Sequence, residues 1–343
     1  MTDHSLVGTA RALVARSKGI LAADESARTI GSRFARLGVE NTEWNRRDYR
    51  EMLFTTAGID NYVSGVILYD ETLRQRGADG TPIVSILSRR GILPGIKVDT
   101  GAHPLAGAPG EMVTEGLDRL RERLAEYYEL GARFTKWRAV INVGPSIPSD
   151  YCIEVNAHAL ARYAALAQEA GLVPIVEPEV MMDGDHSLEK CGAVTEFALR
   201  RVYDQLQEQR VLLEGTLLKS NMVVSGRDAP TRSAPQEVAA KTLECLMRTV
   251  PAAVPGITFL SGGQSDEEAT GNLNAIVLKG QEVGAPWDLS FSFARALQSA
   301  PMKVWAGNGA NVAEAQGTLQ TRARLTAAAR RGELTADMVA PST

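Results

Sequence analysis

The sequence predicts an α/β fold, a (β/α)8 TIM barrel in a single domain. Eight short apolar runs recur about 30 to 45 residues apart, and longer amphipathic segments lie between them. Alternating strands and helices imply a parallel sheet, and eight such units in 343 residues suit a closed barrel. An open doubly wound sheet is the alternative. The nucleotide-binding motifs that would favour an open sheet are absent from the sequence. No GxGxxG follows the first run, and no GxxxxGK[ST] occurs anywhere.

Helix signals separate the apolar runs. Thr114 is expected to cap a helix that ends at Gly131, and Gly171 is expected to end the helix before the fifth strand. The SDEE segment at 265–268 has the pattern of a capping box just after the seventh strand. The candidate strands themselves are the runs at 19–24, 63–70, 91–99, 133–140, 172–179, 215–223, 256–263 and 287–293.

The bulk composition is that of a globular protein, with 44% hydrophobic and 23% charged residues. A formal net charge of -4 argues against a nucleic-acid partner, which normally requires a basic excess. The first residues lack the apolar core of a signal peptide, and no run reaches the ~20 apolar residues of a membrane helix. The three cysteines are scattered, as is typical of reduced thiols. We therefore expect a soluble, cytoplasmic protein with no membrane partner.

Ionisable residues lie at or near the carboxyl ends of five of the eight candidate strands. A barrel gathers these ends around one mouth, where such enzymes place their chemistry. The alternative is that each charge reaches water or forms a structural ion pair. Recurrence at the same end, inside apolar runs, favours a functional site. The residues are Asp24 on the first run, Lys97 and Asp99 on the third, Lys136 and Arg138 on the fourth, Glu177 and Glu179 on the fifth, and Lys219 on the sixth.

Lys219 lies in the middle of the apolar segment VLLEGTLLKSNMV. A lysine that is partly desolvated beside other cations has a lowered pKa, and its free amine can attack a carbonyl to form a Schiff base. Lys136 and Arg138 are the expected cationic neighbours. Glu177 and Glu179 could transfer protons while the Schiff base forms. Alternation along the strand also predicts Asn221 on the same face as Lys219.

Two strand-to-helix junctions suggest phosphate binding. FLSGGQS at 259–265 places a glycine pair before a helix that Ser265 caps, and free backbone N–H groups there could bind an anion. A plain turn is the alternative for this peptide alone. FSFARAL adds Ser292 and Arg295 at the next junction, and many barrels bind a phosphate with the loops after strands seven and eight. The two junctions together favour a phosphate site.

These residues resemble the class I fructose-1,6-bisphosphate aldolase family. The similar segments run in order from about residue 19 to about residue 310, which is most of the chain. Several are long and include the reactive residues, so the resemblance is more specific than any single short motif. The segments are GILAADES at 19–26, ENTEWNRRDYR at 40–50, GIKVD at 95–99, KWR at 136–138, VEPE at 176–179, LLKSNMV at 217–223, FLSGGQS at 259–265 and PWDLSFSFARALQ at 286–298.

The resemblance implies a barrel enzyme, usually a homotetramer, that needs no cofactor. It reversibly cleaves fructose 1,6-bisphosphate to dihydroxyacetone phosphate and glyceraldehyde 3-phosphate. By resemblance, Lys219 forms the Schiff base at C2, and Glu177 is the main acid/base, including at the C4 hydroxyl. Asp24 contacts that hydroxyl, Lys136 favours carbinolamine formation, and Glu179 with Asn221 orients the two lysines.

The resemblance also assigns the substrate-binding residues. Arg138 and Asn221 belong to this group. The residues at the C1 phosphate are Ser261, Gly262, Gly263, Ser292 and Arg295. The residues near the C6 phosphate are Ser26, Thr29, Arg33 and Lys97.

The sequence predicts no metal site, since its four histidines form no close pair and an aldolase with zinc needs histidine ligands. It departs from the animal enzymes at three places. Thr29 replaces a serine, Ala294 replaces a glycine, and the last residues contain no tyrosine. We divide the chain into a catalytic barrel with an N-terminal helix at 1–331 and a mobile tail at 332–343.

Two other functions remain open at this point. One is an aldolase that prefers sedoheptulose 1,7-bisphosphate or fructose 1-phosphate, which relative kcat/KM values would distinguish. The other is a non-catalytic barrel that only binds a sugar phosphate. Such a barrel could lose Lys219 or Glu177, and both are present.

Overall fold

The computed structural model describes residues 5–339, and among these residues eight parallel strands close into one barrel. Their order around the barrel is β1-β10-β9-β8-β7-β6-β3-β2. Each overlaps one of the eight predicted runs, so the (β/α)8 prediction is confirmed. The strands are β1 (Gly19–Ala23), β2 (Val63–Leu68), β3 (Leu93–Lys97), β6 (Phe134–Ile141), β7 (Val173–Val180), β8 (Leu217–Ser220), β9 (Gly256–Phe259) and β10 (Asp288–Phe293).

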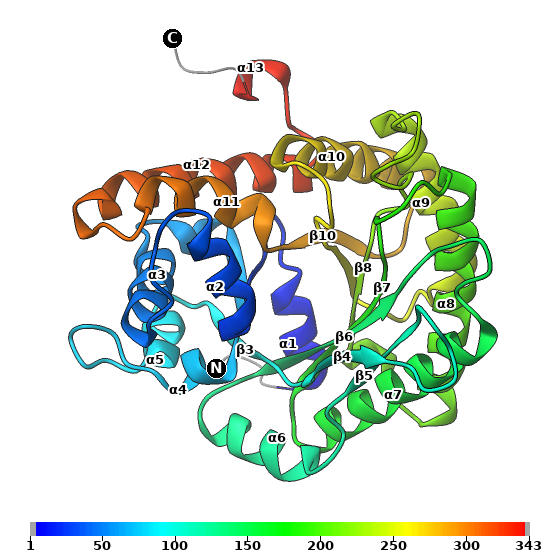
Figure 1. The fold of residues 1–343 in the computed structure, drawn as a ribbon, viewed down its shortest axis with the longest axis horizontal. Helices are drawn as coiled ribbons and strands as arrows, with labels where there is room; N and C mark the ends of the chain where they lie inside the picture. Colours follow the sequence, from blue (N-terminus) through cyan, green and yellow to red (C-terminus); the bar gives the residue numbers. More distant parts are fainter. Residues whose placement is uncertain (1–4, 340–343) are drawn as a thin grey trace.

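Helices surround the barrel (Figure 1). Ser265 and Glu268 form the predicted capping box, and Gly171, at φ +76°, follows the helix that it was expected to end. Short 3-10 turns occupy Ile59–Asn61, Leu213–Gly215 and Gly309–Asn311. The helices are α1 (Leu6–Leu13), α2 (Ala27–Ala35), α3 (Glu43–Thr55), α4 (Asp70–Arg74), α5 (Ile83–Ser88), α6 (Leu120–Glu129), α7 (Asp150–Glu169), α8 (Leu188–Glu208), α9 (Pro235–Thr249), α10 (Asp266–Val283), α11 (Arg295–Trp305), α12 (Val312–Arg330) and α13 (Ala336–Val339).

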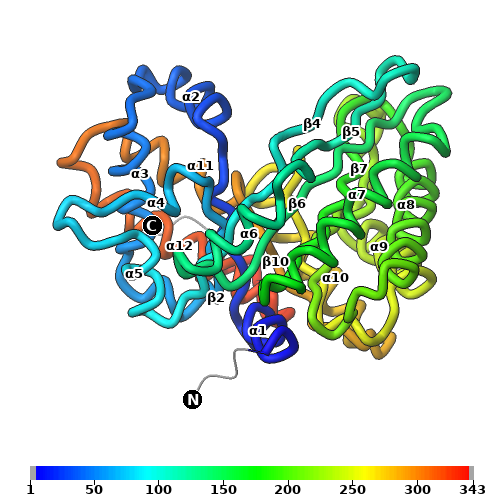
Figure 2. Tube along the Cα trace, turned by 90° about the horizontal axis from the view of Figure 1, so that it is seen from below, coloured from blue at the N-terminus to red at the C-terminus, as the bar shows by residue number. Residues whose placement is uncertain are grey.

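The N-terminal helix closes one end of the barrel. Leu13 and Val14, at the end of α1, belong to the apolar cluster that fills the barrel interior around Phe134. Gly65 and Gly95 leave room for that ring, because a Cβ on either would lie within 3.0 Å of it. Figure 2 shows α1 at one end of the barrel and α2 with β4 and β5 at the other. The second end, where the strands finish, is therefore the open one.

A two-stranded antiparallel hairpin beside the barrel mouth was not predicted. It consists of β4 (Gly101–Pro104) and β5 (Met112–Glu115). The predicted helix start at Thr114 is wrong, because Thr114 lies in β5 and its hydroxyl donates to the Arg138 carbonyl at 2.8 Å. The helix begins at Leu120 instead. Its predicted end is confirmed, since Gly131 follows it with φ +104°.

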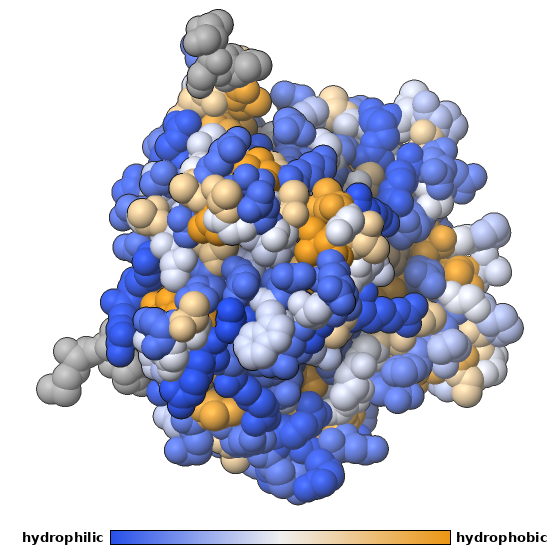
Figure 3. Space-filling view, turned by 60° about the vertical axis from the view of Figure 1, so that its left-hand side comes forward, coloured by the Kyte–Doolittle hydropathy of each residue, from blue (hydrophilic) through white to orange (hydrophobic). Residues whose placement is uncertain are grey.

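One face of the molecule is largely polar. The face in Figure 3 is mostly hydrophilic with small separate apolar patches. Within residues 5–339, no helix is both long enough and apolar enough to cross a membrane. Of the predicted tail, Ala336–Val339 forms α13, whereas 340–343 lie outside the described residues. The division of the chain at residue 331 stays a prediction.

Candidate active site

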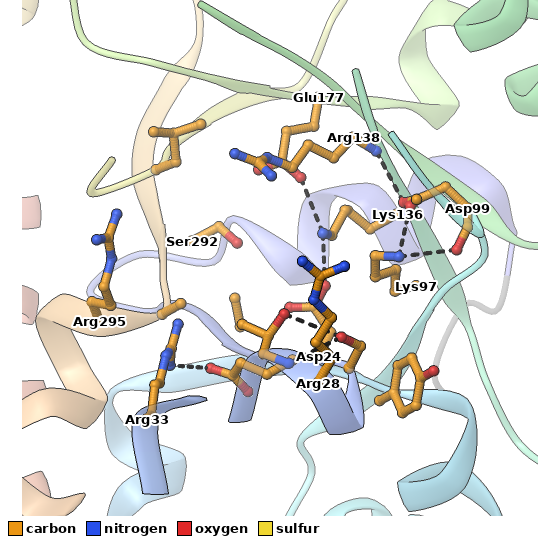
Figure 4. A pocket seen from close by; sticks show the side chains of 18 of the residues that line it. Asp24, Arg28, Arg33, Lys97, Asp99, Lys136, Arg138, Glu177, Ser292 and Arg295 are labelled. Carbon is orange, nitrogen blue, oxygen red and sulfur yellow. Dashed lines mark hydrogen bonds and ion pairs between the residues drawn. The ribbon is translucent and has the colours of Figure 1, made fainter. Parts of the chain in front are cut away.

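A pocket of about 1170 Å³ opens at the carboxyl ends of the strands. The predicted site residues all line it except Asn221 and Gly263. They come from distant parts of the chain, and the barrel brings them together because its parallel strands finish at the same end. Figure 4 shows the side chains that converge on this space.

Four buried side chains form a continuous line of charge at the floor of the pocket. Lys219 Nζ lies 3.0 Å from Glu177 Oε1, and Lys136 Nζ lies 3.3 Å from Glu177 Oε2. Lys136 Nζ also lies 2.6 Å from Asp24 Oδ2. Each of the four residues is at most 9% exposed. Two lysine amines and two carboxylates therefore alternate along a line that is shielded from water.

The strand register explains this arrangement. Lys136, Glu177 and Lys219 lie on the consecutive strands β6, β7 and β8, so Glu177 lies between the two lysines. Asp24 follows β1, which is not a neighbour of β6 in the barrel. The Asp24–Lys136 contact therefore spans the barrel interior. Lys136 and Arg138 were the cations expected near Lys219, and the closest charged group to its Nζ is the Glu177 carboxylate, which lies between Lys219 and Lys136.

The charges set the protonation states of this line. Burial alone would raise the pKa of Asp24, but Lys136 and Lys219 outweigh it and lower that pKa to about 2. For Glu177, burial again acts upward, while Lys136 and Lys219 bring its pKa below the usual value. Burial would lower the pKa of Lys136, yet Asp24 and Glu177 raise it. Near neutral pH, both carboxylates are ionised and Lys136 is charged.

A second layer of ion pairs lies toward the pocket mouth. Lys97 Nζ lies 2.6 Å from Asp99 Oδ1 and also donates to the Asp99 carbonyl at 2.9 Å. Asp99 Oδ2 accepts from the backbone N–H of Arg138 at 3.2 Å. The Arg138 guanidinium pairs with Glu179. Glu179 was expected to orient a lysine, but the structure pairs it with this arginine.

One end of the pocket is suited to an anion. Ser292 is 1% exposed, and within the described part of the chain its Oγ has no hydrogen-bond partner. The Arg295 guanidinium contacts the carbonyl of Gly262, and Ser261 lines the wall nearby. Burial and the positive charge of Arg33 lower the pKa of Arg295. An unpartnered hydroxyl beside close cations is the environment that a phosphate requires.

Arg33 belongs to this end of the pocket. The resemblance grouped it with Lys97, but its charge acts on Arg295, and Figure 4 shows the two arginines on the same side. Arg33 Nη1 lies 2.6 Å from Glu25 Oε1. Ser26 and Thr29, which were placed in the same group, lie at the start of α2 with their hydroxyl oxygens 3.1 Å apart.

The N-terminus of α10 does not itself provide the anion site. Its first turn holds Asp266, Glu267 and Glu268, whose negative charges oppose an anion there. α11 is different, because it begins at Arg295 and has no acidic residue in its first turn. The residues that the two junctions were predicted to contribute thus lie together at the ends of β9 and β10.

Two predicted residues lie outside the pocket. The Asn221 carboxamide accepts from the backbone N–H of Val180 at 3.2 Å and donates to the Thr195 hydroxyl at 3.1 Å. It faces α8 rather than the lysines. Strand β8 ends at Ser220, so alternation no longer holds at position 221. A Cβ on Gly263 would meet Arg227 and Met182 rather than the pocket.

Sequence reasoning missed two residues that shape the pocket. Glu25 is buried, and its carboxylate accepts a hydrogen bond from Gln298 Nε2 at 2.9 Å in addition to its ion pair with Arg33. The backbone carbonyl of Glu25 accepts a hydrogen bond from Arg50 at 2.6 Å. The adjacent acids in AADES were a signal for it. Arg28 lines the pocket from the first turn of α2. In residues 5–339, no three His, Cys, Asp or Glu side chains are grouped as metal ligands would be.

Comparisons with known proteins agree with this geometry. The family model described as Fructose-bisphosphate aldolase class-I matches residues 5–342. The chain is 57% identical to a probable fructose-bisphosphate aldolase class 1 of Xanthomonas campestris pv. campestris, over 94% of this chain and 96% of the relative. It is 55% identical to the cytosolic fructose-bisphosphate aldolase 5 of Arabidopsis thaliana, over 96% and 91%.

The solved structures include a similar fold. The fructose-bisphosphate aldolase of Plasmodium falciparum, in a complex with TRAP and a small-molecule inhibitor, superposes with a TM-score of 0.94. It is 47% identical to this chain, and the match covers 96% of this chain and 95% of that one. The chain belongs to the class I fructose-bisphosphate aldolase family, whose members reversibly cleave fructose 1,6-bisphosphate.

Proposed function

We propose that Lys219 performs the family reaction as the Schiff-base residue, with Glu177 as its proton-transfer partner. The observation that carries the proposal is the buried line Lys219–Glu177–Lys136–Asp24 at the floor of a pocket with cations on both sides. The substrate is fructose 1,6-bisphosphate, and the products are dihydroxyacetone phosphate and glyceraldehyde 3-phosphate.

Imine formation begins with proton transfer from the Lys219 ammonium to Glu177, whose carboxylate is 3.0 Å away. The free amine attacks C2 of the open-chain sugar, and a proton moves from the newly bonded nitrogen to the C2 oxygen to give a carbinolamine. Glu177 then protonates the departing hydroxyl, and water leaves. A carboxylate with a lowered pKa is in the basic form that the first step requires.

Carbon–carbon cleavage follows from the protonated imine. A carboxylate accepts the C4 hydroxyl proton, and the C3–C4 electron pair moves into the imine to give an enamine. Glu177 fits the role of the base, and Asp24, paired with Lys136, fits the role of holding the hydroxyl. Glyceraldehyde 3-phosphate leaves. Protonation of the enamine at C3 and hydrolysis of the imine then release dihydroxyacetone phosphate and restore Lys219.

Lys136 acts through its charge in this scheme. Its ammonium group lies within 3.3 Å of Glu177 and 2.6 Å of Asp24, and its pKa is raised by both. A fixed positive charge stabilises the oxygen that becomes negative as the amine attacks C2. Glu179 and Arg138 support this line from the outer layer through their ion pair.

The two phosphates bind at opposite ends of the pocket in this proposal. Ser261, Gly262, Ser292 and Arg295 receive the C1 phosphate, and Arg33 joins them because it lies beside Arg295. Ser26, Thr29 and Lys97 border the part that receives the C6 phosphate. Outside the pocket, Asn221 accepts a hydrogen bond from the backbone N–H of Val180, and Gly263 leaves room for the Arg227 and Met182 side chains.

We also propose a cytoplasmic homotetramer. The tetramer is supported by the family resemblance, and light scattering after size-exclusion chromatography would test it. The location is supported by the names of similar plant proteins, since relatives from Arabidopsis thaliana and Cicer arietinum are called cytosolic and cytoplasmic. Fractionation of cells that express the native gene would test it.

The proposed mechanism is tested by trapping. The protein is incubated with fructose 1,6-bisphosphate and borohydride, with a chelator present, and the adduct is mapped by mass spectrometry. We expect a stable adduct on Lys219, and we expect Lys219→Met to show neither adduct nor turnover. Near-normal cleavage by that variant, or an adduct on another lysine, would contradict the proposal. Cleavage that the chelator abolishes would indicate a metal-dependent reaction instead.

A further inference from the structure

Arg28 is a pocket residue to which the scheme above gives no role. It lies in the first turn of α2, two residues after the N-cap Ser26. Its side chain is exposed and lines the pocket. In Figure 4 it rises from α2 toward the pocket on the side of Lys97, whereas Arg33, Ser292 and Arg295 lie together on the other side.

Three other cations that line the pocket are already engaged. Lys97 is neutralised by Asp99 at 2.6 Å. Arg123 donates to the carbonyls of Val98 and Gly116, and Arg74 pairs with Asp70 and Glu126. By contrast, the guanidinium of Arg28 has no hydrogen bond or ion pair with any described residue. Only its backbone carbonyl is bonded, as acceptor from the Ser32 hydroxyl.

The position of Arg28 is unfavourable for the helix itself. The N-terminus of a helix carries partial positive charge, so a cation in the first turn is repelled and an acidic residue is preferred. α3, α7, α8 and α10 each have an acidic residue there, whereas α2 has none. The combined positive charge of Arg28 and the helix end suits an anionic ligand.

The chemistry of the substrate identifies that anion. C1 is bonded to C2, the atom that joins Lys219, so the C1 phosphate must bind close to Lys219. The C6 phosphate lies four carbons from C2 and therefore reaches farther. A phosphate monoester carries about 1.5 to 2 negative charges near neutral pH. Two hydroxyl groups and the neutral Lys97–Asp99 pair cannot balance that charge, whereas a free guanidinium can bind phosphate oxygens in a bidentate manner.

We infer that Arg28 is a specificity-determining residue that binds the C6 phosphate and favours bisphosphate substrates over fructose 1-phosphate. The inference rests on the proposed function, because it assumes that C2 of the sugar joins Lys219. It adds a residue to the C6 end that neither the motifs nor the strand pattern indicated.

The test compares Arg28→Ala and Arg28→Lys with the wild type on two substrates. For Arg28→Ala, kcat/KM for fructose 1,6-bisphosphate should fall about 10- to 100-fold, the effect of one charge-assisted hydrogen bond, mainly through a higher KM. The value for fructose 1-phosphate, which has no C6 phosphate, should change less than twofold. Arg28→Lys should recover part of the loss. Arg324→Ala, which removes an exposed arginine of α12 away from the pocket, should behave like the wild type.

Two results would overturn the inference. One is an equal loss for both substrates, which would place the effect at the shared part of the sugar or in the fold. The other is no loss for the bisphosphate. Calorimetric titration of Lys219→Met and of the double variant Lys219→Met/Arg28→Ala with each sugar measures the same preference without turnover. If the wild type shows neither cleavage nor the Lys219 adduct, the proposed mechanism is refuted instead. In that case, a binding preference for the bisphosphate that Arg28→Ala removes would still support the role of Arg28 at the C6 phosphate.

Discussion

Lys136 should matter more than Lys219 for the stability of the folded protein. Lys136→Met removes the cation that lies 2.6 Å from Asp24 and 3.3 Å from Glu177. Asp24 then has no ammonium group at contact distance, and breaking a buried ion pair on one side costs about 3–5 kcal/mol. Lys219→Met leaves Glu177 paired with Lys136, so its cost should be near one charged hydrogen bond, about 1.5–3 kcal/mol.

These free energies translate into melting temperatures. The entropy of unfolding is about 2.1 cal/mol/K per residue, or roughly 0.7 kcal/mol/K for 343 residues. Lys136→Met should therefore lower Tm by about 4–7 °C, and Lys219→Met by about 2–4 °C. Scanning calorimetry at pH 7 measures both. Lys190→Met, which changes an exposed lysine on α8, controls for the substitution itself and should leave Tm nearly unchanged.

The pH dependence gives a second check with a definite sign. The pKa of Asp24 in the folded wild type is lowered to about 2 from a model-peptide value of 3.8. Its stabilising contribution is thus present above pH 3.8 and lost only as the pH falls through about 2. In Lys136→Met, the charge and hydrogen bond of Lys136 are lost while the burial of Asp24 remains, so the pKa of Asp24 should rise relative to the wild type and part of the penalty should be relieved as that carboxyl becomes protonated. The Tm difference should be smaller at pH 4 than at pH 7. Equal Tm losses for the two lysine variants, or a constant difference from pH 7 to pH 4, would refute the reasoning.

Two further predictions test the chemistry and the barrel interior. Glu177→Gln should lower kcat by about 10² to 10⁴ and slow borohydride trapping, because the proton-transfer group is lost while the shape is kept; a decrease of less than tenfold in steady-state assays would contradict the role. Gly95→Ala should lower the free energy of unfolding by about 1–3 kcal/mol, because the added Cβ would lie 2.3 Å from Phe134. Gly271→Ala, where nothing lies within 4 Å of the added Cβ, should keep or raise Tm in the same thermal scans.

The position of each strand was predictable because it depends on local pattern. A buried parallel strand appears as a short apolar run whichever neighbours it has, so all eight barrel strands were found. The hairpin of β4 and β5 was missed, since strands of four residues with partly exposed side chains leave no such pattern. The charges at the strand ends were likewise visible, because Lys136 and Lys219 interrupt apolar runs where a lysine is costly to bury.

The partner of each charge was decided by the tertiary structure. Asp24 and Lys136 lie on non-adjacent strands and meet across the barrel interior, a contact that depends on barrel closure and register. Alternation failed for Asn221 because β8 ends one residue earlier, and only the hydrogen bonds that end the strand determine that point. Arg28 and Arg33 lie on the same short helix, α2, but their side chains point to different ends of the pocket. Arg33 lies beside Arg295, whereas Arg28 lies on the side of Lys97. The sequence by itself thus determined which residue types reach the barrel mouth, and the closure of the barrel determined which of them meet.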